Sequence, residues 1–323
     1  MEPLLPLFRL PNSVIIEVIK NFHLKQLFAF SLVSTKTKDL VTSLGIKTSN
    51  IYIGVSNVLR VSVISGENYL CLNFYDESKY VNGLSPVDIT LPVDVCFEYK
   101  GKRMQASTPF NFSAWINYIR SIFCFTLPLN IRFYGGCGKY GIELLKDTTG
   151  NVNDLFVSPL VTDVMSRTIL KHFNTPSRLF LLKNPFEDGC EVQKFFIQNF
   201  QFMEYHDVYS LDDMLLVNSE IVRFTHRTTH KQFNQFLQHW IRGSNPRLQF
   251  MFLIIKKINV ASREVNGIRC MEMSEDAKRE IRQKHNLPIE VDMVKIKRKD
   301  GTSAVIAIED IEHIFFFRFI VLH

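Results

Sequence analysis

The segment IVRFTHRTTHKQFNQFLQHWIRGSNPRLQFMFLII, residues 221–255, predicts a strand, a helix and a second strand in that order. Thr229 followed by Gln232 is the pattern of a capping box at a helix start, and Gly243 with Pro246 indicates where the helix ends. Between these signals, apolar side chains recur at intervals of three and four residues: Phe233, Phe236, Leu237, Trp240 and Ile241. One face of this helix is therefore expected to be buried.

The alternation of strand and helix extends from this segment toward the N-terminus. A similar helix is expected after Asp188 and Glu191, with Val192, Phe195 and Phe196 on its apolar face. Candidate strands start at steps of 19 to 27 residues, near Asn130, Leu155, Arg178, Phe202, Ile221 and Leu248. A period in the twenties favours one strand and one helix per unit, as in leucine-rich-repeat-like folds.

Two other regions show a period of two, which is typical of strands. Beyond about residue 255 the chain is expected to be β-rich, and Val294 and Ile296 alternate with lysines before Asp300 and Gly301, which predicts a C-terminal β hairpin. Residues 48–105 are expected to form a linking β meander. Its alternating apolar residues fall in four runs: Ile51 and Ile53; Leu59, Val61 and Val63; Leu70, Leu72 and Phe74; Val93, Val95 and Phe97.

The first forty-odd residues predict three short helices. Pro11 suits the first turn of a helix, because proline has no N–H to leave unpaired there. A second helix is expected within residues 24–34, and Ser34 or Thr35 is expected to cap a third that runs through Lys38 to Leu44. A unit of ~40 residues rarely holds together alone. Because this one carries more apolar residues than it can bury, we expect one face to be covered by a partner or by the rest of the chain.

The composition excludes several classes of protein. The 323 residues correspond to about two domains, and 46% hydrophobic with 22% charged residues indicates a folded chain. The sequence contains no run of ~18 apolar residues, so no membrane span is predicted. The first residues lack the pattern of a secretory signal. A formal charge of +6 does not demand nucleic acid as a partner. The expected location is intracellular, in the cytoplasm, the nucleus or both.

The cysteines show no paired spacing that would indicate a metal site or a redox motif. Most of them lie among apolar neighbours on predicted strands or helices, which favours reduced thiols in the core. The six residues are Cys71, Cys96, Cys124, Cys137, Cys190 and Cys270.

One glycine cluster matches the letters of a dinucleotide-binding motif, in which the backbone approaches a pyrophosphate. Gly136, Gly138 and Gly141 follow a predicted strand, and Asp154 or Asp163 lies about twenty residues further on. However, the helix predicted over residues 142–146 is shorter than such a site requires. A turn is the expected structure, and a nucleotide-dependent enzyme using this loop is kept as an alternative function.

Other candidate chemistry is weaker still. His226 and His230 are four residues apart but lack the glutamate of a zinc-protease helix. The basic run of Lys295, Lys297, Arg298 and Lys299 is explained by the solvated face of a strand, and a nucleic-acid-binding protein using residues 295–299 is the second alternative. No catalytic residue, no metal site and no cofactor is expected, so the chain is not predicted to be an enzyme.

Two parts of the chain resemble a known family. Residues 8–11 (FRLP), the apolar pairs at 14–15 and 18–19, and residues 27–41 (LFAFSLVSTKTKDLV) resemble the F-box. The segments 215–219 (LLVNS), 233–248 (FNQFLQHWIRGSNPRL) and 296–301 (IKRKDG) are similar to the type 2 F-box-associated domain of nematode F-box families. One departure is that no tryptophan follows the third helix, as it does in many other F-boxes, which leaves the end of this domain open.

The resemblance implies a substrate-recognition subunit of an SCF-type cullin-RING ubiquitin ligase. Residues 7–47 would be the F-box, and residues 106–322 would be the F-box-associated domain that recruits a protein substrate. The F-box would bind a Skp-type adaptor and, through it, a cullin; no membrane or nucleic-acid partner is expected. The implied adaptor-binding residues are Leu10, Pro11, Val14, Ile15, Val18, Ile19, Leu24, Leu27, Phe30 and Leu32. The sequence leaves the substrate open.

Overall fold

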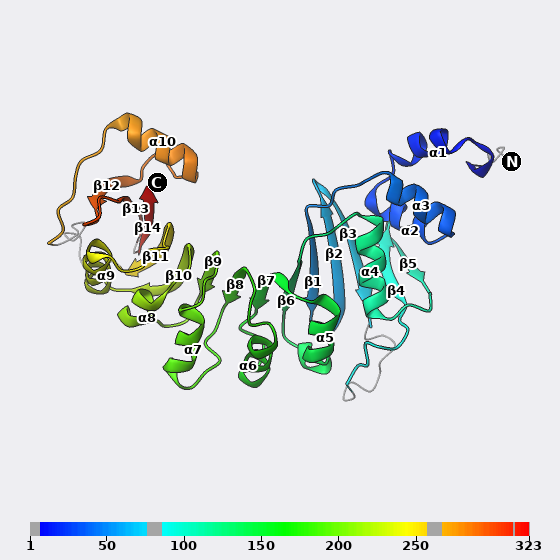
Figure 1. Cartoon of the computed structure of the whole chain (residues 1–323), viewed down its shortest axis with the longest axis horizontal. Helices are drawn as coiled ribbons and strands as arrows, with labels where there is room; N and C mark the ends of the chain where they lie inside the picture. Colours follow the sequence, from blue (N-terminus) through cyan, green and yellow to red (C-terminus); the bar gives the residue numbers. More distant parts are fainter. Residues whose placement is uncertain (1–6, 76–85, 257–266, 313, 323) are drawn as a thin grey trace. The chain divides into compact units, whose positions relative to one another are not determined.

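The computed structural model describes residues 7–75, 86–256, 267–312 and 314–322. The chain divides into two compact units, Met1–Pro176 (unit 1) and Ser177–His323 (unit 2) (Figure 1). Each unit contains a sheet with helices packed on it, so the fold is of the α+β kind. Parts of the predicted linking region (76–85) and of the predicted C-terminal domain (257–266) lie outside the described residues.

Unit 1 begins with the three helices that the sequence predicts. The third is capped by Ser34, whose Oγ accepts a hydrogen bond from the Thr37 backbone N–H at 3.2 Å, while the Thr37 hydroxyl accepts one from the Ser34 N–H at 2.9 Å. Pro11 is the N-cap, with extended ψ of 146°, rather than a residue of the first turn. The elements are η1 (Leu7–Arg9), α1 (Asn12–Ile19), α2 (Leu24–Ser31) and α3 (Thr35–Ser43).

The strands of unit 1 lie in the order β7-β6-β1-β2-β3-β4-β5. The strands from β1 to β5 pair antiparallel with their neighbours, and β6 pairs parallel with β1 and with β7. Strand β5 is not predicted by the sequence pattern, because all but its last side chain are exposed and it has no apolar alternation. The bounds are β1 (Asn50–Val55), β2 (Leu59–Ser65), β3 (Asn68–Phe74), β4 (Val95–Tyr99), β5 (Lys102–Ala106), β6 (Leu129–Phe133) and β7 (Val152–Val157).

The three N-terminal helices are anchored to the rest of unit 1 by Phe28. Its ring is fully buried and contacts Phe97 of β4 at 5.4 Å and Trp115 of α4 at 6.1 Å between ring centroids. Tyr118 also donates a hydrogen bond to Ser31 Oγ at 2.9 Å. The helices of unit 1 that follow are α4 (Phe112–Ile122), η3 (Cys137–Lys139), α5 (Ile142–Thr149) and α6 (Asp163–His172). The helical trio is thus packed on the sheet as well as on itself.

Unit 2 contains four parallel strands, β8 to β11, followed in space by antiparallel strands in the order β14-β13-β12. β8, β9 and β10 begin at the predicted residues, and β11 begins two residues later. The strands are β8 (Arg178–Leu181), β9 (Phe202–Tyr205), β10 (Ile221–Thr228), β11 (Phe250–Lys256), β12 (Asp292–Lys297), β13 (Ser303–Ile311) and β14 (Ile314–Leu322). The helices are α7 (Gly189–Phe196), α8 (Leu211–Leu216), α9 (His230–Arg242) and α10 (Glu275–His285).

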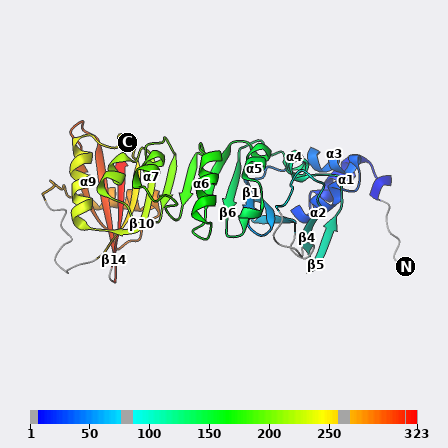
Figure 2. The same ribbon diagram turned by 90° about the horizontal axis from the view of Figure 1, so that it is seen from below.

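Helix α9 has the predicted bounds and the predicted buried face. Thr229 Oγ1 accepts a hydrogen bond from the Gln232 N–H at 3.2 Å, and the helix ends at Gly243, whose φ is 122°. The reciprocal half of the capping box is different, because Gln232 Oε1 accepts from the Thr228 hydroxyl at 2.8 Å instead. Trp240 is fully buried, and its ring contacts Phe319 of β14 at 4.9 Å. Figure 2 shows α7 and α9 in front of the strands of unit 2.

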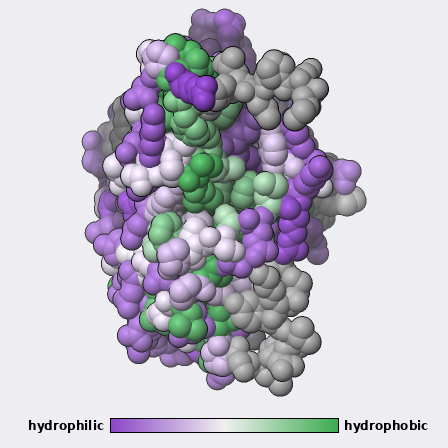
Figure 3. Space-filling model, turned by 90° about the vertical axis from the view of Figure 1, so that its right-hand side faces the viewer, coloured by the Kyte–Doolittle hydropathy of each residue, from purple (hydrophilic) through white to green (hydrophobic). Residues whose placement is uncertain are grey.

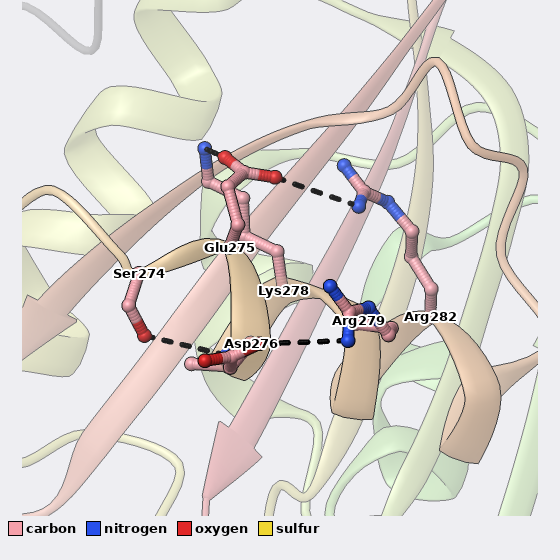
Figure 4. Close-up of polar contacts among 7 residues, drawn as sticks. Ser274, Glu275, Asp276, Lys278, Arg279 and Arg282 are labelled. Atoms are coloured by element: carbon pink, nitrogen blue, oxygen red, sulfur yellow. Dashed lines mark hydrogen bonds and ion pairs between the residues drawn. The ribbon is translucent and has the colours of Figure 1, made fainter.

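Helix α10 lies on the opposite face of the unit 2 sheet from α9 (Figure 1). Its buried residue Ile281 packs with Met293, Val305 and Ile320 of the antiparallel strands. Ion pairs run along its exposed side (Figure 4): Glu275 lies 2.7 Å from Lys278 and 3.9 Å from Arg282, and Asp276 lies 3.5 Å from Arg279. Acidic residues in the first turn and basic residues in the last turn also suit the helix dipole.

The predicted C-terminal hairpin is formed by β12 and β13, but its faces differ from the prediction. Asp292 to Lys297 pair in register with Ile308 to Ser303. Met293 and Ile296 are the buried residues of β12, whereas Val294 is half-buried. The reason is that Met293 packs with Ile281 of α10, so a helix covers the face that the simple alternation assigns to solvent.

Candidate protein interaction surfaces

The ten predicted adaptor-binding residues fall into two groups. Four are buried in the interior of unit 1: Ile15, Ile19, Leu24 and Leu27. Leu24 and Leu27 also line a small cavity of about 220 Å³ between α2 and the turn that joins β2 to β3. These four side chains belong to the core that the trio shares with the sheet, so they are not available on the surface.

The other six predicted residues reach the surface. Pro11, Val14 and Val18 are exposed, and Leu10, Phe30 and Leu32 are half-buried. Val14 and Val18 lie one helical turn apart, so they share one face of α1. An apolar surplus therefore exists on the trio after it has packed against its own chain.

The structure adds Phe8 and Val33 to this surface, with 48% and 66% of their area exposed. Phe8 stacks on Phe30 at 6.2 Å between ring centroids, and the Lys36 ammonium lies 5.9 Å from the centre of the Phe8 ring. We call Phe8, Leu10, Pro11, Val14, Val18, Phe30, Leu32 and Val33 the F-box apolar surface. Figure 3, which looks onto this end of unit 1, shows a hydrophobic band bordered by hydrophilic residues.

The glycine cluster of the nucleotide-binding alternative has a structural explanation. Gly136 has a φ of 84°, and a Cβ at this position would overlap the side chain of Asn57. The backbone of Gly136 therefore lies against the side chain of Asn57, in the space that a pyrophosphate would need. The helix after the loop, α5, continues to Thr149 and is longer than predicted, but at eight residues it remains short.

The cysteines differ in part from the prediction. All six are free, but Cys124, Cys190 and Cys270 are exposed instead of lying in the core. Cys190 lies in the first turn of α7, two residues after the Asp188 cap, and off the face that Val192 and Phe196 bury. Burial raises the pKa of Cys137, which lies in the glycine loop, to about 11. This thiol is therefore protonated at neutral pH and poorly suited to act as a nucleophile.

His230 and Arg298 make structural contacts, whereas Lys297 and Lys299 of the basic run are exposed. His226 is exposed on β10, and the His230 ring packs against Phe315 and Phe317. Arg298 stacks on Trp240 at 5.6 Å and donates a hydrogen bond to the Gly243 carbonyl at 2.8 Å. Among the described residues, no three His, Cys, Asp or Glu side chains gather where they could hold a metal ion.

Asn245 joins the segments on which the F-box-associated resemblance was based. It is 5% exposed, has a φ of 50°, and its side-chain N–H groups donate to the carbonyls of Met214, Leu215 and Val217 at 2.8 to 3.2 Å. These carbonyls lie at the C-terminal end of α8, where backbone acceptors lack helical partners. The loop after α9 therefore provides hydrogen-bond donors for the carbonyls at the C-terminal end of α8.

Comparison with protein families identifies two domains. Residues 7–49 match the family described as "F-box domain", and residues 191–253 match the family described as "F-box associated". The second match includes Asn245 and the whole of α9. No curated protein and no solved structure matches the chain. The chain thus contains an F-box and an F-box-associated domain, and families with these domains are typically non-enzymatic adaptors.

The two domains support the predicted class, a protein-interaction subunit of the SCF substrate-receptor kind. Within the described ranges, no helix combines the length and the apolar character that crossing a bilayer requires.

Proposed function

We propose that this protein is the substrate-recognition subunit of an SCF-type ubiquitin ligase. The observation that supports this proposal most strongly is the F-box apolar surface, which stays exposed although the helices beneath it are packed on the sheet. A partner that covers Val14 and Val18 would remove their apolar area from water, at roughly 25 cal/mol per Å². The proposed partner is a Skp-type adaptor, which would in turn bind a cullin. We also propose that the protein is a member of the nematode F-box families.

The proposed mechanism is tethering rather than bond chemistry. Binding the adaptor through the F-box and a substrate through the C-terminal domain would raise the local concentration of substrate lysines beside the ubiquitin-charged enzyme. The strand-helix units of residues 106–255, read as a leucine-rich-repeat-like scaffold, would hold the substrate surface. Residues 7–47 and 106–322 are the proposed bounds of the two binding regions.

Capture of a purified Skp-type adaptor tests the proposal. In Val14→Glu with Val18→Glu, two charges replace exposed apolar side chains, so folding should be preserved while the affinity for the adaptor falls about 30-fold or more. Pro11→Ser with Leu10→Ala should also weaken binding. Val164→Glu is the matched control, because Val164 is 68% exposed on α6, outside the F-box. Equal adaptor binding by the α1 variant and the control would refute the proposed surface.

A further inference from the structure

A cleft of about 600 Å³ lies on the face of the unit 2 sheet that α10 borders. Strands β8 to β11 form its floor, and Lys284 and His285 at the end of α10 form one wall. The His285 ring stacks on Phe250 at 6.3 Å with an interplanar angle of 15°. The described residues that line the cleft are Arg178, Phe180, Phe202, Glu204, Ile221, Arg223, Gln249, Phe250, Lys284, His285 and Val321.

Strand register arranges the floor of the cleft in two rows. Neighbouring parallel strands place their paired residues side by side on one face. The first row consists of Arg178, Phe202, Ile221 and Phe250. The second row consists of Phe180, Glu204 and Arg223, and it continues to Phe252, which lies outside the cleft lining. Each row combines aromatic rings with charged groups, and the residues that alternate with them along the strands are buried on the other face.

The aromatic rings orient the guanidinium groups. Arg178 lies 4.8 Å from the centre of the Phe202 ring and 5.3 Å from that of Phe180, and Arg223 lies 5.7 Å from that of Phe252. Stacking uses the flat face of a guanidinium, whereas its N–H donors point outward from the edge. The donors are thus oriented in the plane that a carboxylate would approach.

Among the described lining residues the charge of the cleft is unbalanced, because two cationic side chains, Arg223 and Lys284, lie with a single carboxylate, that of Glu204. Glu204 already lies 2.6 Å from His206 and 3.5 Å from Arg223. Half of the Arg223 side chain, 51%, remains exposed. A concave surface with this excess of positive charge attracts an anionic partner.

The same residues favour a peptide over a nucleic acid. Single-stranded nucleic acids stack their bases on open aromatic faces, but guanidinium groups already lie over the rings of Phe180, Phe202 and Phe252. Apolar groups beside the cations, such as Ile221 and Phe250, suit a chain that alternates carboxylates with apolar side chains.

We propose that this cleft binds an acidic peptide segment of a protein partner, with carboxylates at Arg223 and Lys284 and an apolar side chain on the row of Phe202, Ile221 and Phe250. The inference rests on the proposed function, because it assigns the substrate class: proteins with an accessible acidic and apolar segment.

Selection from two random peptide libraries with the full-length protein tests the inference. One library carries Asp or Glu at alternate positions, and the other carries Lys or Arg at the same positions. We expect enrichment from the acidic library, and affinities for the selected peptides that fall as salt is raised. Enrichment from the basic library, or from neither library, would overturn the inference.

Charge-reversal variants locate the site. Arg223→Glu with Lys284→Glu should weaken a selected peptide at least tenfold. Arg227→Glu with Arg279→Glu is the matched control, because these exposed residues lie on the same strand and the same helix but do not line the cleft. Equal weakening by both pairs would exclude this site, as would an oligonucleotide that binds the cleft in place of the peptide.

Adaptor capture by the same variants separates the two proposals. The cleft variants should bind a Skp-type adaptor as the unmodified protein does. Peptide binding without adaptor binding would contradict the ligase role and leave the cleft assignment standing. Adaptor binding with no peptide selected would contradict the cleft assignment alone.

Discussion

The F-box apolar surface and the unit 2 cleft are built in opposite ways. The first uses residues close together in the sequence, such as Val14 and Val18 on adjacent turns of α1, and it is apolar. The second collects residues between 178 and 321 from several strands and a helix, and it sets charges on aromatic rings. Local helical periodicity therefore reveals the first surface, whereas the second exists only through strand register. In both regions, substitution of a buried residue should lower stability more than substitution of an exposed residue.

The largest effect is expected for Phe28→Ala, which removes the anchor of the helical trio. Phe28 is fully buried against Phe97 and Trp115, so the free energy of unfolding should fall by about 3–5 kcal/mol. Val33→Ala, at a residue of the F-box apolar surface that is 66% exposed, should change stability by less than ~0.5 kcal/mol. Urea denaturation measures both. Similar losses would break the distinction between the core and the surface of the F-box.

The second prediction concerns Asn245→Ala in unit 2. The substitution removes three hydrogen bonds to carbonyls of α8 and the residues after it. At ~0.5–1.5 kcal/mol for each bond, unfolding should be easier by about 2–4 kcal/mol. Gln238→Ala, at an exposed position of α9, is the control. A thermal melt in which both variants match the unmodified protein would show that this loop does not support the domain.

Acid should weaken unit 2 through His230 and His285. Burial lowers the pKa of His230, and burial followed by the nearby Lys284 lowers the pKa of His285. The unfolded chain takes up these protons near pH ~6.5, but the folded chain does so only at lower pH. Stability should therefore fall as pH drops below ~6.5, until the folded pKa values are passed. His230→Phe should reduce this slope in pH-dependent denaturation, and an unchanged slope would contradict the role of His230.

The smallest effect is expected for Glu275→Gln on α10. Glu275 pairs with Lys278 and Arg282, and these contacts lower its pKa, but the carboxylate is in solvent and salt screens it. We expect a slight decrease in melting temperature at low salt that disappears at high salt. Because Lys284 and His285 stay in place, peptide binding in the cleft should not change. A large loss of binding would show that the cleft depends on the far end of the helix.

Much of the fold could be predicted from local patterns. The capping signal at Thr229, the apolar stripe and the stop at Gly243 depend on residues within one helix; the structure confirms the cap, the stop and the burial of the stripe from Phe233 to Trp240, whereas its last residue, Ile241, is half-buried. The strand starts at Arg178, Phe202 and Ile221 could also be predicted from neighbouring residues, because one face of each strand is buried under helices. The sequence could not show which F-box residues are buried and which are on the surface. Periodicity marks both Val14 and Ile15 as apolar, but it does not show which of them packs against the rest of the chain.

The remaining features depend on contacts between distant residues. β5 carries no apolar alternation, so its pairing with β4 had no signal in the sequence. The burial of Met293 in place of Val294 depends on α10, which covers a face that the hairpin pattern alone assigns to solvent. The cleft could have been suspected from the residues that alternate with the buried ones on β8 to β10, namely Arg178, Phe180, Glu204 and Arg223. Their convergence required the strand register.

The pairing of β14 with β11 has a consequence for truncated forms of the chain. β14 covers the hydrogen-bonding edge of β11 from Phe250 to Lys256, and its Phe317 and Phe319 fill the space beside Phe233 and Trp240. A fragment that stops at residue 253, where the family match ends, would expose both a bare strand edge and an aromatic core. Such edges promote aggregation. Premature termination in the last tenth of the chain should therefore yield an insoluble product destined for proteolysis.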